Sequence, residues 1–128
     1  MKKTVLIVDD SCVVRQQVTI ALKAAGFAIL QAVDGMDGLA ALENNQGIDM
    51  VICDINMPNM NGLDMLDQVK GHPKHKALPV VMLTTEGQAS MVKRAKEAGA
   101  VGWIVKPFKS PQLVQVVARV TKTEAPAC

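Results

Sequence analysis

The sequence contains very few aromatic residues and no long apolar run. Aromatic residues make up 2% of the chain, namely Phe27, Trp103 and Phe108, and tyrosine is absent. A core must therefore be built from Val, Leu, Ile, Met and Ala. No apolar run approaches the roughly 20 residues that a membrane-spanning helix needs. The early apolar run Val5–Val8 ends in two acids and is too short for a signal peptide. These absences predict a cytoplasmic protein without membrane insertion.

Basic stripes, paired cysteines and a phosphate loop are also lacking. The formal net charge is only +2, and no dense basic stripe accompanies it, which argues against nucleic-acid binding. The three cysteines, Cys12, Cys53 and Cys128, are odd in number and lack metal-binding spacing, so reduced thiols are expected. No glycine-rich loop follows the first apolar run, which makes a nucleotide-binding module improbable.

Short apolar runs alternate with segments of helical periodicity along the 128 residues, a length that fits one domain. The runs are continuously apolar, as expected for strands covered on both faces. The predicted strands are Thr4–Val8, Ala28–Val33, Ile48–Cys53, Val80–Thr84 and Val101–Val105. Five such strand–helix units predict an α/β domain in which helices cover both faces of a parallel sheet. We expect this domain to occupy residues 1–122, followed by a short polar tail over residues 123–128.

Glycine, serine and proline mark several helix ends. Gly26 and Gly99 follow helical stripes, at positions where helices favour glycine. Ser110 precedes Pro111, which predicts a helix with Ser110 as its N-cap and Pro111 in its first turn.

Polar residues end or directly follow four of the predicted strands. They are Asp9, Asp10, Asp54, Thr84 and Lys106. Ligands of open parallel sheets bind beyond the carboxyl ends of the strands, so these side chains should converge. Three crowded carboxylates repel one another, and a Mg²⁺ ion together with Lys106 would balance their charge. Because a carboxylate can form an aspartyl phosphate, the pattern predicts a magnesium-dependent phosphoryl-transfer site.

Four stretches of the sequence carry a family resemblance: "LIVDDS", "DINMPNMNG", "PVVMLTTE" and "VKPF". Together they resemble the response-regulator receiver domain, in particular the chemotaxis type, over essentially the whole chain. The resemblance implies a flavodoxin-like, doubly wound sheet of five parallel strands in the order 2-1-3-4-5, with five helices. It also implies a phosphorylation-activated switch of a two-component system rather than an enzyme. Such a switch accepts phosphoryl groups from small donors and hydrolyses its own acyl phosphate.

The resemblance assigns the acids distinct roles. Asp54 would accept the phosphoryl group from a histidine kinase. Asp10 and Asp54 would ligate Mg²⁺, with the backbone carbonyl of Asn56 as the third protein ligand. Asp9 would act mainly through metal-bound water.

Other residues would take part in the conformational switch or set the rate of acyl-phosphate hydrolysis. Lys106 would contact the phosphoryl group and bridge toward Asp54, with a cis peptide before Pro107. Thr84 would move onto the phosphoryl oxygens. Trp103 stands where the family often has a switch Tyr or Phe; its larger ring should hinder inward rotation, and the alternative is a half-buried strand residue. Asn56 and Glu86 would tune acyl-phosphate hydrolysis, or else be solvated loop residues.

The resemblance also implies partners. An output protein, such as the flagellar motor switch, would dock on the face formed by the fourth helix, the strand Val101–Val105 and the last helix. A phosphatase is a further expected partner, and the chain should be monomeric. Two other functions stay open: a phosphate sink for a shared kinase, and a magnesium-dependent phosphohydrolase. The hydrolase is disfavoured because Asp9 and Asp10 are adjacent and no cap insertion is present.

Three further features have simple expected explanations. His72 and His75 could bind metal, but no cysteine or acid completes a set nearby in the sequence, so a solvated loop is expected. Cys53 should be an inert core thiol on the face opposite Asp54. The basic residues Lys93, Arg94 and Lys96 should form a solvated face beside the expected docking surface.

Overall fold

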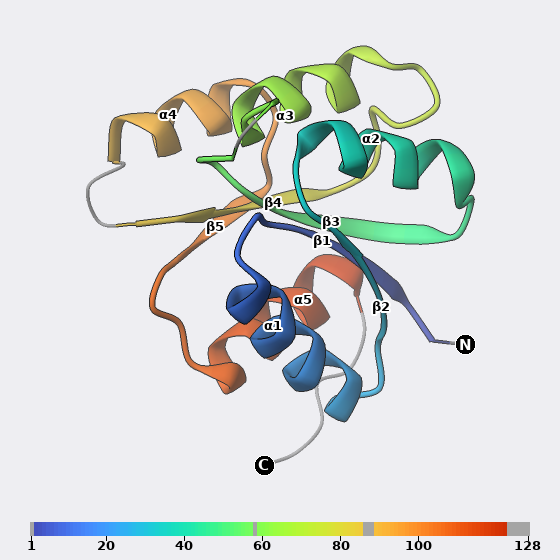
Figure 1. The fold of residues 1–128 in the computed structure, drawn as a ribbon, viewed down its shortest axis with the longest axis vertical. Coiled ribbons are helices and arrows are strands. Elements are labelled where there is room, and N and C mark those ends of the chain that lie inside the picture. The colour runs from blue at the N-terminus through green and yellow to red at the C-terminus, as the bar shows by residue number, and fades with distance from the viewer. Residues whose placement is uncertain (1, 58, 86–88, 123–128) are drawn as a thin grey trace.

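The computed structural model describes residues 2–57, 59–85 and 89–122 (Figure 1). Glu86, Cys128 and the predicted tail lie outside the described residues. Strands and helices alternate along the chain. They are β1 (Thr4–Val8), α1 (Cys12–Ala24), β2 (Ala28–Ala32), α2 (Gly35–Asn44), β3 (Ile48–Asp54), α3 (Gly62–Gly71), β4 (Val80–Thr84), α4 (Ala89–Glu97), β5 (Gly102–Val105) and α5 (Ser110–Thr121).

All neighbouring strands are parallel, and their order in the sheet is β2-β1-β3-β4-β5. This confirms the predicted fold class and strand order. Helices α1 and α5 cover one face of the sheet, and α2, α3 and α4 cover the other (Figure 1). Among the residues that the structure describes, no helix is long and apolar enough to cross a membrane.

The apolar strands contribute side chains to two separate hydrophobic cores, one on each face of the sheet. Val5 and Ile7 of β1 pack in the core beneath α1 and α5, whereas Leu6 and Val8 pack in the core beneath α2 and α3. All four side chains are fully buried. Because successive side chains of a strand point to opposite faces, a strand covered on both faces must be apolar at every position. This explains the continuous apolar runs of the sequence.

Element boundaries differ from the predictions by one residue at several ends. β3 continues through Asp54, β2 ends at Ala32 and β5 begins at Gly102. The predicted N-cap at Ser110 is wrong, since the Leu113 N–H donates to the Lys109 carbonyl, which makes Lys109 the cap. Ser110 and Pro111 both fit inside the first turn because the N–H groups there have no helical acceptor.

The two predicted glycine helix ends are confirmed. Gly26 and Gly99 have φ values of 96° and 107°, in the left-handed region that glycine adopts without a side-chain penalty. These short turns return the chain to the sheet at the starts of β2 and β5.

Candidate functional site

Three carboxylates meet at the carboxyl edge of the sheet. Val8 of β1 lies opposite Cys53 of β3, so the residues that follow them, Asp9 and Asp54, are brought side by side. Carboxylate oxygens of Asp9, Asp10 and Asp54 all lie within 4.8 Å of one another. The predicted convergence of these acids is therefore present in the structure.

Lys106 reaches the same cluster from the end of β5. Thr84 of β4 pairs with Val105, and the next residue donates its backbone N–H to the Thr84 carbonyl at 2.6 Å. The Lys106 Nζ lies 2.9 Å from Asp9 Oδ2 and 3.2 Å from Asp54 Oδ1. The Lys106–Pro107 peptide is cis, as the resemblance implied.

Burial sets the electrostatics of the cluster. Asp9 is 0% exposed and Asp54 is 7% exposed. Burial and the neighbouring Asp9 charge raise the pKa of the Asp54 carboxyl, and Lys106 only partly opposes this. Burial lowers the pKa of Lys106, but its hydrogen bond to Asp9 and the charges of Asp9 and Asp54 outweigh burial and raise it. Lys106 therefore stays protonated and positively charged. The negative charge of Asp54 is only partly balanced by its neighbours.

Asp9 is held in place by its own contacts. Its Oδ1 accepts the Ser11 N–H at 2.8 Å, its Oδ2 accepts from Lys106, and its backbone carbonyl accepts from Arg15 Nη1 at 2.7 Å. Asp10 is exposed, and Asp54 is buried but slightly more accessible than Asp9. Asp10 and Asp54 thus keep carboxylate oxygens available to a cation, and the roles of Ser11 and Arg15 had no signal in the sequence.

Thr84 presents a buried hydroxyl at the end of β4. The residue is 1% exposed, and its Oγ1 has no hydrogen-bond partner among the residues that the structure describes. A buried polar group without a partner is costly and rare in folded proteins. An anionic oxygen placed beside Asp54 would give this hydroxyl an acceptor. The acids, the ammonium and the unpartnered hydroxyl together suit a phosphoryl group held with a divalent cation.

The loop after Asp54 is closely packed against the end of strand β3. Gly62 donates its N–H to the Ile55 carbonyl at 2.8 Å, and a Cβ at this position would overlap the Asp54 backbone oxygen. Asn56 is exposed and comes two residues after Asp54. Gly62 is thus required for the close approach that shapes the loop carrying Asn56.

Trp103 lies on the edge strand β5. Its side chain is 41% exposed, and Lys96 Nζ lies 5.2 Å from the ring centroid. Met91, Val101 and Val105 are also exposed, at 39%, 56% and 37%. These apolar side chains and the exposed Lys93, Arg94 and Lys96 lie on the α4 and β5 part of the predicted docking face.

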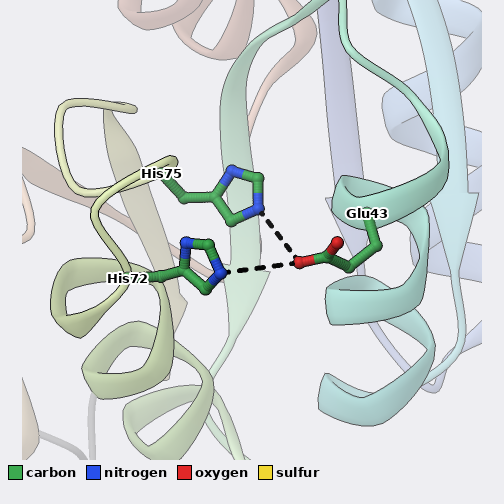
Figure 2. A group of neighbouring side chains, drawn as sticks. All are labelled: Glu43, His72 and His75. Carbon is green, nitrogen blue, oxygen red and sulfur yellow. Dashed lines mark ion pairs between the residues drawn. The ribbon is translucent and has the colours of Figure 1, made fainter.

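The expectation of a solvated histidine loop holds for His72, whose side chain is 46% exposed, but not for His75. The His75 side chain is only 11% exposed, and the Nε2 atoms of His72 and His75 each lie 3.7 Å from Glu43 Oε1 (Figure 2). Sequence reasoning missed Glu43 because it belongs to another helix, far earlier in the chain. Only the packing of α2 against α3 brings the acid to the two imidazoles.

Comparison with known proteins gives a consistent result. Residues 5–118 match the family described as the response regulator receiver domain. The chemotaxis protein CheY1 of Helicobacter pylori is 38% identical over 111 residues, which cover 86% of this chain and 89% of that protein. A chemotaxis protein CheY homolog of Campylobacter jejuni is 37% identical over 111 residues, covering 86% of this chain and 85% of that protein.

Solved structures agree with the sequence relatives. Chemotaxis response regulator CheY4 of Vibrio cholerae superposes with a TM-score of 0.87 at 38% identity, covering 94% of this chain and 99% of that one. A response regulator of Chloroflexus aurantiacus, described as putative, superposes with a TM-score of 0.90 at 34% identity, covering 95% and 99% of the two chains.

Proposed function

The chain belongs to the response-regulator receiver family, whose members are phosphorylation-activated switches of two-component signalling, and we propose that Asp54 is its phosphoryl acceptor. The proposal is carried by one observation. Asp54 is a buried carboxylate, at the end of a central strand, that lies within reach of Lys106 and of two further acids. Such a carboxylate is positioned as a nucleophile whose attacking oxygen is fixed before a donor arrives.

Asp10, Asp54 and the backbone carbonyl of Asn56 are proposed to hold the Mg²⁺ ion. Bound there, the ion would supply positive charge to the transferred phosphoryl oxygens. Asp9 holds Lys106 through the 2.9 Å contact, and Lys106 places its ammonium beside Asp54 Oδ1, next to where the phosphoryl group would be attached. Three carboxylates, one ammonium and one divalent cation leave the resting site neutral.

The proposed reaction is a phosphoryl transfer from a histidine kinase. An Asp54 oxygen attacks the phosphorus of a phosphohistidine, a P–O bond forms, and the P–N bond breaks with its electron pair returning to the imidazole nitrogen. Lys106 stabilises charge on the phosphoryl oxygens, and the Thr84 hydroxyl donates a hydrogen bond to one of them. In this way the transfer gives the buried Thr84 Oγ1 an acceptor, which it does not have among the described residues.

The proposed output runs from Thr84 to β5. Movement of the Thr84 side chain toward the phosphoryl group vacates space behind it, and Trp103 turns part of the way into this space from its half-exposed position, because the volume of the indole ring hinders complete inward rotation. The exposed patch of Met91, Val101, Trp103 and Val105 then changes shape on the α4–β5–α5 face. A protein partner that docks there by apolar contact would respond to the change. The chemotaxis names of the relatives support an output of the chemotaxis type.

Labelling by a small phosphodonor tests the acceptor. Intact-mass spectrometry after incubation with acetyl phosphate and Mg²⁺ should show one added phosphoryl group on the protein. Asp54→Asn should abolish the adduct, whereas the matched variant Asp64→Asn, an exposed acid in the first turn of α3, should keep it. Normal labelling of Asp54→Asn would show that another residue is the acceptor.

Trp103 fluorescence tests the output, since the chain contains a single tryptophan. Adding beryllofluoride with Mg²⁺, a phosphoryl mimic, should shift the emission to the blue and protect the ring from acrylamide quenching. Thr84→Ala should bind the mimic but lose this response. Emission that stays unchanged in the native protein, although the mimic binds, would contradict the switch and favour the phosphate-sink function.

A further inference from the structure

We propose that Glu43, His72 and His75 form a second metal site, of the zinc type, at the amino-terminal edge of the sheet (Figure 2). Glu43 lies in the last turn of α2, His72 caps the carboxyl end of α3, and His75 lies in the turn that leads into β4. The site is thus built from segments that precede β3 and β4. No part of the phosphorylation switch uses these residues.

The distances suit a bridging ion better than a direct hydrogen bond. Both imidazole Nε2 atoms lie 3.7 Å from the same Glu43 oxygen, which is too long for a hydrogen bond. Two tetrahedral ligands of zinc, each at about 2.0–2.1 Å, are separated by roughly 3.4 Å. The three ligand atoms all lie within 4.8 Å of one another. Shifts of a few tenths of an ångström to about one ångström would therefore bring them onto one ion.

His75 supplies an independent observation that points to a ligand. Its side chain is only 11% exposed, and its Nε2 is buried without a hydrogen-bond partner in the described part of the chain. Figure 2 shows this nitrogen and the His72 Nε2 both directed at the Glu43 carboxylate. A metal ion placed between them would give the buried nitrogen a partner.

The turn that carries the histidines is already ordered by hydrogen bonds. The His75 and Lys76 N–H groups donate to the His72 carbonyl at 3.0 and 2.9 Å. Lys70 Nζ donates to the Lys76 and Leu78 carbonyls at 3.2 and 2.8 Å. The two imidazole rings stack with centroids 4.8 Å apart and planes inclined by 32°. Little conformational freedom is left to lose when a metal binds, which favours affinity.

Metal binding has a recognisable structural consequence at Lys74. In the structure the Lys74 N–H donates to His72 Nδ1 at 3.1 Å, so the proton of a neutral ring lies on Nε2. Coordination through Nε2 moves that proton to Nδ1 and ends the Lys74 hydrogen bond. The Lys74 amide therefore reports a proton on His72 Nδ1, and following it at constant pH as Zn²⁺ is added distinguishes coordination from simple protonation of the ring.

The chemistry of the donors selects the ion. Two imidazoles and one carboxylate, with a further position open to solvent, form a ligand set that zinc uses in proteins. Mg²⁺ prefers oxygen ligands, so it should stay with the aspartates. The strand β3, with seven residues, separates the two edges by about 20 Å, so the sites can fill independently. A bound ion would fasten the end of α2 to the α3–β4 turn.

The test is a Zn²⁺ titration of the full chain in excess Mg²⁺, followed by NMR. The chain has two histidines, so two sets of imidazole signals report the site directly. We expect both imidazoles and the Lys74 amide to shift together and to saturate at one equivalent of Zn²⁺. The thermal midpoint of unfolding should rise with Zn²⁺, because a ligand of the folded state stabilises it.

Matched variants distinguish Zn²⁺ binding at the proposed site from Zn²⁺ binding by other thiols or carboxylates. In a Cys12→Ser background, Glu43→Gln should weaken Zn²⁺ binding by at least about tenfold, since even outer-shell changes at metal sites cost that much. Glu97→Gln, an exposed glutamate of α4, should leave the affinity unchanged. Equal affinities of the two variants, or Zn²⁺ shifts confined to residues around Asp54, would overturn the proposal. Neither result depends on phosphorylation of Asp54.

Discussion

Lys106 lies closer to Asp9 than to Asp54 in the resting structure. Its Nζ is 2.9 Å from Asp9 Oδ2 and 3.2 Å from Asp54 Oδ1. Asp9 is fully buried and has a second oxygen bound to the Ser11 N–H, so it acts as a fixed counter-ion for the ammonium. Asp54 receives only a share of the positive charge. The negative charge of Asp54, the proposed acceptor, is therefore less fully balanced than that of Asp9 until a cation or a phosphoryl group binds.

The first prediction concerns the stability of Asp54→Asn without Mg²⁺. Burial and the Asp9 charge raise the pKa of Asp54 above its ordinary value of 3.8, so the folded state holds this proton more tightly than the unfolded state does. The contribution of Asp54 to the free energy of unfolding therefore decreases as the pH rises above 3.8. The variant cannot ionise and avoids this loss. We expect its thermal midpoint to exceed that of the native protein by a few degrees at neutral pH.

The pH dependence provides the control for this prediction. The difference between Asp54→Asn and the native protein should shrink as the pH falls toward 3.8, and it should also shrink when Mg²⁺ is added. Asp64→Asn, which changes an exposed acid, should show neither dependence. A midpoint of Asp54→Asn below the native value at neutral pH would contradict the electrostatic account.

The second prediction concerns Lys106→Met. Removing the ammonium leaves the fully buried Asp9 carboxylate without its charged partner, in contact with Asp54. Breaking such a pair should lower the free energy of unfolding by roughly 2–4 kcal/mol. Mg²⁺ should restore part of this loss. Urea denaturation with and without Mg²⁺ measures both effects, and Lys93→Met on the exposed face of α4 should change stability by less than about 0.5 kcal/mol. Equal stabilities of the two variants would show that Lys106 is not a structural counter-ion.

The third prediction concerns Gly62→Ala. The added Cβ overlaps the Asp54 backbone oxygen, so the loop or the end of β3 must shift. Forcing a side chain into such space should cost about 1–3 kcal/mol and slow labelling by acetyl phosphate, because the acceptor moves with its backbone. Gly47→Ala meets no heavy atom within 4 Å and is the matched control. Native stability and labelling in Gly62→Ala would mean that the close approach at Asp54 is unimportant.

The fourth prediction concerns thiol reactivity. Burial and the charges of Asp54 and Asp9 raise the pKa of the Cys53 thiol well above its usual range, whereas Cys12 is exposed. Iodoacetamide should therefore alkylate Cys12 readily in the native protein. Alkylation of Cys53 should be slower by at least roughly 100-fold, since reaction at Cys53 requires unfolding. Peptide mass spectrometry separates the sites. Similar rates at both cysteines in the native protein would show that the β3 core opens readily.

Much of the fold could be predicted from the local pattern of apolar residues in the sequence. The run Val5–Val8 predicted a strand covered on both faces, and the structure places its side chains alternately in the two cores. The least accurate predictions lay at element ends, such as Ser110, where the N-cap depended on which carbonyl the Leu113 N–H reaches. Such choices follow from backbone geometry over several residues, and a residue type alone does not determine them.

The sequence by itself determined that acids, a hydroxyl and an ammonium end successive strands, because parallel strands must deliver those ends to one edge. Only the tertiary structure decided that Lys106 pairs most closely with Asp9, that the Thr84 hydroxyl is left without a partner in the described chain, and that Glu43 meets His72 and His75. These outcomes depend on packing between segments remote in sequence. Periodicity reports which face of an element is buried, but it carries no information on which side chains of two packed elements come into contact.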